Sequence, residues 1–219
     1  MKYELAIFDM DGTILDTLED LTDAMNYCLE KYKMPLKSLD QIRSYVGNGI
    51  HKLIERAVPK ETISTTIEEI YALFSEYYRE HCAIKTKPYA GICQVIATLK
   101  NQGIKTAVVS NKADFAVKSL CDDYFCGLFD YSVGDKPGIR RKPYPDGVIQ
   151  VMNYFNVALN KAVYIGDSDV DFHTAQNAGL DVIMVGWGFR DEDFLYSIGA
   201  KKVINEPAEI LHIITKQPQ

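Results

Sequence analysis

The segment YELAIFDMDGTILD, residues 3–16, decides how the rest of the sequence is interpreted. Its apolar run Leu5–Phe8 predicts a buried strand that ends directly before Asp9, and Asp11 follows two residues later. In an open parallel sheet, ligands bind beyond the carboxyl ends of the strands, so carboxylates at such an end face a binding crevice. A plain loop is also commonly rich in Asp and Gly, so this segment alone leaves both interpretations open.

Three further segments each combine an apolar run with polar residues directly after it. The apolar runs predict strands at residues 104–109, 131–133 and 162–165. The polar residues are Ser110 and Asn111 after the first run, Arg140, Arg141 and Lys142 in the turn after the second, and Asp167 and Asp171 after the third. If these strands are neighbours in one parallel sheet, the polar groups meet at one edge.

This set of groups is suited to the transfer of a phosphoryl group. Asp9, Asp167 and Asp171 offer only oxygen ligands, which favours Mg²⁺. Without a cation, the carboxylates would repel one another and an incoming phosphate dianion. With it, one carboxylate can attack phosphorus while the cation and a basic side chain stabilise charge on the equatorial oxygens. The Ser110 hydroxyl can bind phosphate oxygens, and a second acid can protonate the leaving alkoxide.

Together these residues resemble the four motifs of the haloacid dehalogenase-like superfamily. The matching residues are Asp9 to Thr13, Ser110, Lys142 with Pro143, and Gly166 to Asp171. The resemblance selects Lys142 among the three basic residues, which charge alone does not. It implies that Asp9 is the nucleophile that forms an aspartyl-phosphate and that Asp11 is the general acid and base.

The resemblance also implies the ligands of the metal and of the phosphate. Mg²⁺ is expected at Asp9, the Asp11 carbonyl and Asp167, with Asp171 supporting the metal shell. The phosphate-binding residues are expected to be Gly12, Ser110, Asn111 and Lys142, joined by Asn48 from elsewhere in the chain.

The distance along the chain between Asp9 and Ser110 predicts an inserted domain. A βαβ unit needs about 30 residues or somewhat more, and this separation is roughly three times as long. Apolar residues repeat at helical spacing within it, and Thr17 with Asp20 predicts a capped helix start. We expect about four helices that form a cap domain over residues 17–87.

The remaining residues, 1–16 and 88–219, are then expected to form an α/β core with a Rossmann-like parallel sheet. Because the insert begins and ends beside the first strand, it is expected to cover the site, exclude water and select the substrate. In the loop at residues 45–50, Asn48 is either a ligand contact or part of a plain turn. Lys52 and Arg56 either meet a substrate anion or are solvated surface charges.

Three expectations concern other polar and aromatic residues of the core. Ser110 and Asn111 can also cap a helix, in which case Lys112 is an exposed residue of its first turn. Trp187 is expected to be a packing or rim aromatic. The tail after Ile214 is polar and terminal, and we expect it to be disordered.

Composition sets the broad class of the protein. The chain has 219 residues, of which 47% are hydrophobic, and a formal net charge of -6. These values are typical of a globular protein and argue against a nucleic-acid or anionic-membrane partner. Charges at Glu4, Asp9 and Asp11 argue against a signal peptide, and no run of about 18 apolar residues predicts a membrane span. The five scattered cysteines are typical of a reduced, cytoplasmic protein.

The resemblance extends beyond the four motifs, and over essentially the whole chain it is to the phosphoglycolate phosphatase branch of the superfamily. The segments that carry it are the helical insert, Val-Gly-Asn-Gly, Ser-Asn-Lys, Lys-Pro-x-Pro and Gly-Ala-x-x-Val-Ile. The resemblance implies a Mg²⁺-dependent phosphatase, either a monomer or a homodimer, that acts on a small phosphorylated metabolite with phosphoglycolate favoured. Asp11 disfavours a dehalogenase, and Thr13 disfavours a β-phosphoglucomutase-like phosphotransferase.

Pyrophosphatase and nucleotide phosphatase activities stay open as alternatives. From other classes of protein, a phosphoaspartate signalling receiver and an inactive regulatory relative are also considered. A receiver is disfavoured by the long insertion and by the second acid, since receivers are single compact domains. An inactive relative is disfavoured because all four motifs are intact.

Overall fold

The computed structural model describes residues 2–215 of the chain. Of the tail after Ile214, for which disorder was predicted, Thr215 is helical and residues 216–219 lie outside the described range. The chain divides into two compact units. We call Asp16–Lys87 the insert and the rest of the described chain the core unit. The chain leaves the core unit at β2 (Leu15–Asp16) and returns at β3 (Lys87–Pro88), and these two short strands pair with each other.

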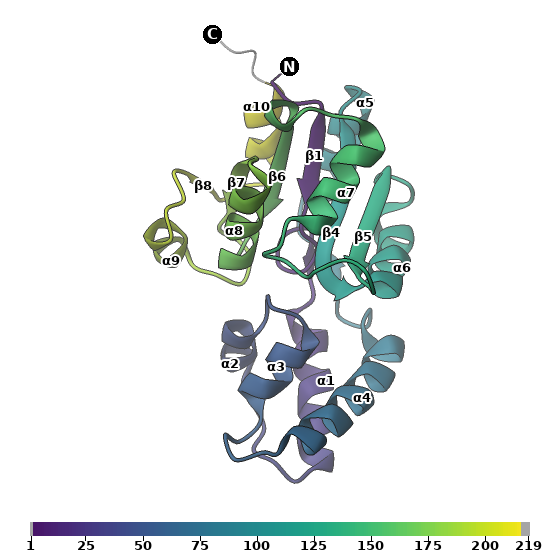
Figure 1. Ribbon diagram of the computed structural model, residues 1–219, viewed down its shortest axis with the longest axis vertical. Coiled ribbons are helices and arrows are strands. Elements are labelled where there is room, and N and C mark those ends of the chain that lie inside the picture. The colour runs from purple at the N-terminus through teal and green to yellow at the C-terminus, as the bar shows by residue number, and fades with distance from the viewer. Residues whose placement is uncertain (1, 216–219) are drawn as a thin grey trace. The chain divides into compact units, whose positions relative to one another are not determined.

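A six-stranded sheet organises the core unit, and its strands pair in parallel (Figure 1). In spatial order the strands are β5 (Tyr131–Asp135), β4 (Lys105–Ala113), β1 (Leu5–Phe8), β6 (Ala162–Gly166), β7 (Asp181–Val185) and β8 (Val203–Ile204). Because the strands are parallel, their carboxyl ends all lie at one edge. The predicted α/β class with a Rossmann-like parallel sheet is confirmed.

The central strand β1 is buried on both faces, as its uninterrupted apolar sequence predicts. Ala6 and Phe8 pack among the residues of α5 (Ile92–Asn101), α6 (Asp114–Phe125) and α10 (Ala208–Thr215), whereas Leu5 and Ile7 face α7 (Asp146–Phe155) and α8 (Asp169–Ala178). All four side chains are fully buried. Their burial stabilises the fold and holds β1, including its carboxyl end, in place.

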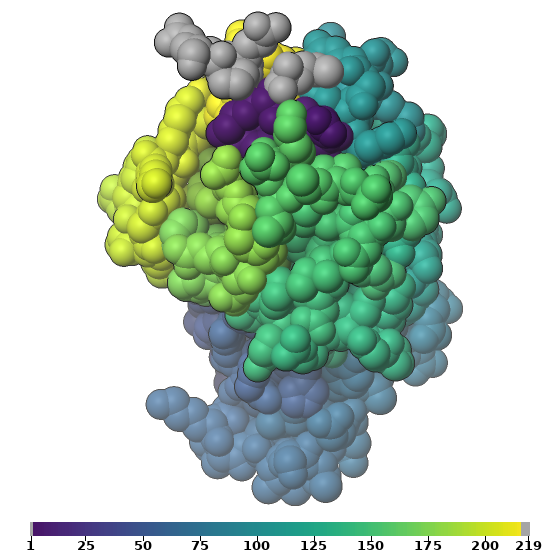
Figure 2. All heavy atoms as spheres, turned by 45° about the horizontal axis from the view of Figure 1, so that its top comes forward, coloured from purple at the N-terminus to yellow at the C-terminus, as the bar shows by residue number. Residues whose placement is uncertain are grey.

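Segments that are distant in the sequence surround the start of the chain. In Figure 2 the purple N-terminal segment lies between the yellow C-terminal segment and the teal segment that contains α5. Within the sheet, β1 is likewise central, with β4 on one side and β6 on the other. The smaller helix α9 (Glu192–Ser197) packs through Leu195 against Met184 and Val203.

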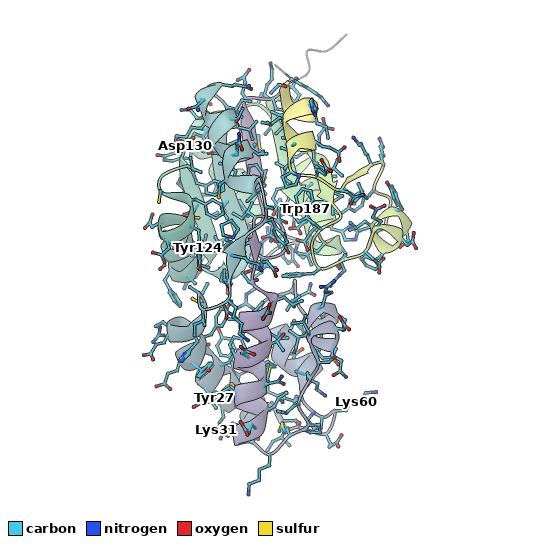
Figure 3. All side chains as sticks on the ribbon, turned by 180° about the vertical axis from the view of Figure 1, so that it is seen from behind. Tyr27, Lys31, Lys60, Tyr124, Asp130 and Trp187 are labelled. Carbon is cyan, nitrogen blue, oxygen red and sulfur yellow. The ribbon has the colours of Figure 1, made fainter. Side chains whose placement is uncertain are left out.

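Four α-helices form the insert, and they are α1 (Leu18–Lys31), α2 (Leu39–Tyr45), α3 (Ile50–Ala57) and α4 (Ser64–His81). Helix α1 packs against both α2 and α4. Its Tyr27 ring, labelled in Figure 3, stacks on Tyr77 of α4 with 4.0 Å between the ring centroids. In α1, α3 and α4 the apolar residues recur at helical spacing, because each of these helices buries one stripe of its surface. Helix α2 buries only Ile42 and carries no such pattern.

The predicted capping of α1 by Thr17 and Asp20 is wrong. Thr17 occupies the N-cap position, but its φ of -109° and ψ of 2° are not extended, and its side chain makes no capping hydrogen bond. Asp20 is buried and accepts hydrogen bonds from the main-chain N–H groups of Lys85, at 3.0 Å, and Thr86, at 2.8 Å. A buried carboxylate needs such donors, so Asp20 joins the first helix of the insert to its final segment.

Candidate active site

Asp9 directly follows the buried strand β1, at the carboxyl edge of the sheet. Phe8 pairs with Val108 of β4 and Ile165 of β6, and the Asp9 N–H donates to the Ile165 carbonyl at 2.9 Å. This pairing fixes the backbone that carries the Asp9 carboxylate. Asp9, Asp167 and Asp171 each offer a carboxylate oxygen, and these oxygens lie within 4.8 Å of one another. The acids that were predicted to gather at this edge do so.

A capping box at the start of α8 positions Asp171. The Ser168 side chain accepts from the Asp171 N–H, while the Asp171 carboxylate accepts from the Ser168 N–H at 3.1 Å and from its hydroxyl at 2.6 Å. Ser-x-x-Asp is a capping sequence because each of the two residues satisfies a main-chain N–H of the other. The same interaction that begins the helix therefore fixes the orientation of a fully buried carboxylate.

Two hydrogen-bond donors hold Asp167, and neither is predicted from the sequence. The Thr13 hydroxyl donates to Asp167 Oδ1 at 2.9 Å, and the Phe189 N–H donates to Oδ2 at 2.8 Å. The Trp187 indole N–H donates to the Thr13 carbonyl at 3.1 Å, and this ring is labelled in Figure 3. The predicted packing role of Trp187 thus includes a hydrogen bond to the loop after β1.

Three glycines leave the space that these carboxylates occupy. A Cβ on Gly12 would lie 2.4 Å from Asp167 Oδ2, and one on Gly188 would lie 2.3 Å from Asp167 Cβ. A Cβ on Gly166 would lie 2.3 Å from Asp171 Cβ. Gly12 also has a φ of +85°, which other residues rarely adopt. The main chain at these three glycines therefore lies directly against the side chains of Asp167 and Asp171. We call Gly12, Gly166 and Gly188 the site glycines.

Lys142 is the basic side chain that pairs with the acidic cluster. Its Nζ lies 2.7 Å from Asp9 Oδ1 and 2.7 Å from Asp171 Oδ1, and only 4% of the side chain is exposed. The Asn111 amide fixes the lysine backbone, because its Oδ1 accepts from Lys142 N at 2.8 Å and its Nδ2 donates to Lys142 O at 3.1 Å. Tyr164, which the sequence did not indicate, lies 3.2 Å from Lys142 Nζ and donates to Asp171. The expected contact of Asn111 with phosphate stays a prediction.

Burial dominates the electrostatics of the cluster. It raises the pKa of Asp9 well above its usual range, with a further contribution from Asp171 that Lys142 partly opposes. Burial, and then the Asp171 charge, raise the pKa of Asp167 to about 7. Burial acts to lower the pKa of Lys142, but Asp171 and Asp9 outweigh it, so this pKa is well above its usual value. When ionised, the cluster is more negative than one ammonium group can balance.

These residues fit a divalent cation. The donors are oxygen atoms only, which suits a hard ion such as Mg²⁺. Asp9 Oδ1 is buried, with the Lys142 ammonium 2.7 Å away, and the same ammonium also lies 2.7 Å from Asp171 Oδ1. Lys142 supplies one positive charge beside three buried carboxylates, and a divalent cation would lower the repulsion that is left between them.

The segment after Val109 differs from the prediction. Strand β4 continues through Ala113 with a shift in its pairing to β5, and α6 begins only at Asp114. Ser110 and Asn111 therefore do not cap a helix. The apolar helical pattern begins only after residue 114, and this late start is the sequence signal that favours a longer strand. Ser110 is buried, and its hydroxyl accepts from Lys112 N at 3.2 Å.

The prediction that Lys112 is exposed is wrong. Its side chain is only 4% exposed, and its Nζ donates to Asp11 Oδ1 at 2.9 Å. A buried ammonium requires a partner, and Asp11 provides one. The extended strand places Lys112 beside the second acid of the first motif, whereas a helix starting at Ser110 would have placed it elsewhere.

Within the insert, the loop before α3 is held by its own helix. Gly49 occupies the N-cap position with a φ of +86°, directly after the half-buried Asn48. The Arg56 guanidinium donates to the Tyr45 carbonyl at 2.6 Å, so this side chain anchors the loop. Lys52 is exposed and lies 2.5 Å from Glu55. The predicted ligand contact of Asn48 stays a prediction.

The fold and the site define a Rossmann-like α/β enzyme with acids, a hydroxyl and two lysines at the carboxyl ends of its strands. The model of the haloacid dehalogenase-like hydrolase family matches residues 6–185, which is most of the chain. The chain therefore belongs to this family, and within it the chain is a phosphatase.

Relatives called phosphoglycolate phosphatase match nearly the whole chain. One from Psychrobacter arcticus is 32% identical over 197 residues, which cover 86% of each chain. Another from Aquifex aeolicus is 31% identical over 184 residues, which cover 84% of each. A crystal structure from Lactobacillus delbrueckii subsp. bulgaricus, of a proposed phosphoglycolate phosphatase, has a TM-score of 0.94 and 38% identity, covering 98% of this chain and 99% of that one.

Among the described residues, every helix is too short or too polar to cross a membrane.

Proposed function

We propose that this phosphatase depends on Mg²⁺ and hydrolyses a small phosphate monoester, phosphoglycolate in the first place, through an aspartyl-phosphate on Asp9. The observation that carries the proposal is the environment of Asp9. Its carboxylate lies at the end of the central strand, beside two further acids, and its Oδ1 lies 2.7 Å from the Lys142 ammonium. A carboxylate in this position can act as a nucleophile, and the neighbouring acids can hold a metal ion.

Each residue then has a defined part in the reaction. Asp9 attacks phosphorus and the bond from phosphorus to the ester oxygen breaks, while Asp11 protonates the leaving alkoxide. Asp11 next takes a proton from water, which attacks the phosphoryl group, frees Asp9 and releases inorganic phosphate. Lys142 and Ser110 stabilise the charge on the phosphoryl oxygens, together with the main chain of Gly12 and with Asn111.

Mg²⁺ would be held by Asp9, the Asp11 carbonyl and Asp167, with Asp171 supporting this arrangement. Bound there, the ion would lower the repulsion between the phosphate and the carboxylates. The pKa shifts of the cluster support this assignment, because burial and the neighbouring acids destabilise the ionised carboxylates without a cation.

Residues 17–87, which lie within the insert, are proposed to act as the cap that selects the substrate, with Asn48 as a contact. The favoured substrate follows from the name that the relatives share. Pyrophosphate, nucleotides and sugar phosphates are the competing substrates to be tested. A cytoplasmic location and a monomeric or homodimeric state belong to the same proposal.

The experiment compares Asp9→Asn with Asp123→Asn, an exposed acid on α6 that serves as the matched control. Phosphate release is measured from a panel of phosphorylated metabolites with Mg²⁺ and with EDTA. We expect Asp9→Asn to lose at least about 10³-fold in kcat, because no other group replaces the nucleophile. We expect Asp123→Asn to match the wild type.

Undiminished Mg²⁺-dependent turnover by Asp9→Asn would remove Asp9 as the nucleophile. Wild-type protein inactive on the whole panel would favour the regulatory alternative, and a single phosphorylation without turnover would favour the receiver. Faster turnover of another ester would replace phosphoglycolate as the substrate while leaving the mechanism intact.

A further inference from the structure

Lys112 combines deep burial with a contact to an acid that is itself partly accessible. The lysine side chain is 4% exposed, whereas the side chain of its partner Asp11 is 21% exposed. The ammonium group donates to Asp11 Oδ1 at 2.9 Å. Taking an ammonium group out of water is costly, so this lysine is held in the core unit by strong compensating contacts.

The backbone of Lys112 is fixed as firmly as its side chain. It belongs to β4, and its N–H donates to the Ser110 hydroxyl at 3.2 Å. The neighbouring strand approaches so closely that a Cβ on Gly134 would lie 2.5 Å from the Lys112 carbonyl oxygen. Because only 4% of the Lys112 side chain is exposed, the surrounding atoms leave it little freedom, and its ammonium group favours one position for the oxygen that it binds.

Asp11, in contrast, lies in the loop after β1. Its carboxylate rotates about two side-chain bonds unless a partner holds it, and general acid catalysis requires the acid within hydrogen-bond reach of the leaving oxygen. The contact to Lys112 restricts this rotation. Lys142 does not supply this function, because its contacts are to Asp9 and Asp171.

We propose that Lys112 is a positioning residue that fixes the Asp11 carboxylate for proton transfer to and from the substrate. The inference deepens the proposed function, since it rests on Asp11 being the general acid and base. It separates the roles of the two buried lysines, with Lys142 acting at the nucleophile and Lys112 at the proton-transfer acid.

The test is a double-mutant cycle of Lys112→Met and Asp11→Asn, with Lys112→Arg as the conservative variant. Each protein is assayed with phosphoglycolate, whose leaving group is an alkoxide, and with 4-nitrophenyl phosphate, whose leaving group needs little protonation. We expect Lys112→Met to lower kcat for phosphoglycolate by about tenfold or more with KM changed less than about twofold. For the aryl ester, we expect a loss below about threefold, and Lys112→Arg should restore part of the loss.

The cycle separates positioning from a general loss of structure. In the Asp11→Asn background, Lys112→Met should cause no further loss of kcat, because the group it positions has already been disabled. Lys118→Met, an exposed lysine paired with Asp114, should match the wild type throughout. Thermal unfolding of every variant reports whether it folds.

The positioning role would be overturned if Lys112→Met lowered kcat equally for the two esters. It would also be overturned if the double mutant lost the product of the two single-mutant fold-changes in kcat. If Asp11→Asn discriminates between the esters and Lys112→Met does not, Lys112 is excluded while the proposed mechanism stands. If Asp11→Asn itself does not discriminate, the proton-transfer role of Asp11 fails and the positioning role fails with it.

Discussion

Replacing Lys142 by Met should strongly destabilise the folded protein. The Nζ atom lies 2.7 Å from both Asp9 Oδ1 and Asp171 Oδ1, and the side chain is 4% exposed. Removing one partner of a buried ion pair typically costs about 3–5 kcal/mol, because the remaining charge stays buried without compensation. We therefore expect the free energy of unfolding to fall by about 3–5 kcal/mol near pH 8 in the presence of EDTA.

The loss should shrink as the pH falls. Lys142 acts to lower the pKa of Asp9, so its removal raises that pKa further above the value in the unfolded chain. A carboxyl group with a raised pKa binds protons more readily in the folded state, and acid then favours folding. The pKa of Lys142 itself is raised, so its contribution is lost only at strongly alkaline pH, far from this range.

Urea unfolding followed by circular dichroism at pH 8, 6.5 and 5 measures both effects. Lys161→Met is the matched control, because Lys161 pairs with Glu4 on the surface, where the side chains are 41% and 58% exposed. An exposed pair contributes less than about 1 kcal/mol. Equal losses for the two variants, or a Lys142→Met loss that is the same at all three pH values, would refute this reasoning.

Two further predictions concern metal binding and the insert. Mg²⁺ should raise the melting temperature of the wild type more at pH 8 than at pH 5.5, because protons compete for Asp167, whose pKa is about 7. Calorimetry with EDTA as the reference checks this, and a shift that does not depend on pH would contradict it. Asp20→Asn should lower stability by about 1–3 kcal/mol, since its carboxylate accepts main-chain hydrogen bonds from Lys85 and Thr86. Chemical denaturation measures the loss against Glu19→Gln, an exposed acid in the same turn, and equal values for the two would exclude the structural role of Asp20.

The fold could be predicted from the sequence because its signals are local and repeated. Apolar runs such as Leu5–Phe8 define the strands, and apolar stripes with helical spacing define the helices of the insert. The acidic cluster could be predicted because parallel strands place their ends at one edge, which brings Asp9 and Asp167 together from distant parts of the chain.

The errors arose where partners distant in sequence decide the local conformation. Lys112 follows two good capping residues, but β4 pairs with β5 on both sides of it, at Val109 and Ala113, and Asp11 compensates its charge. Asp20 lies where a capping acid is expected, yet amides 65 and 66 residues away bind it. The Phe189 N–H that holds Asp167 carries no side-chain signal, because every residue except proline offers the same main-chain donor.

The site glycines have a consequence for how this protein diverges from its relatives. Main-chain atoms and carboxylates fill the volume in which a methyl group at Gly12, Gly166 or Gly188 would have to lie. Substitution at these positions therefore cannot adjust the size or polarity of the acidic cluster by small steps, since even alanine would displace an acid. New substrate preferences must then evolve through residues elsewhere, while the phosphate chemistry is inherited unchanged.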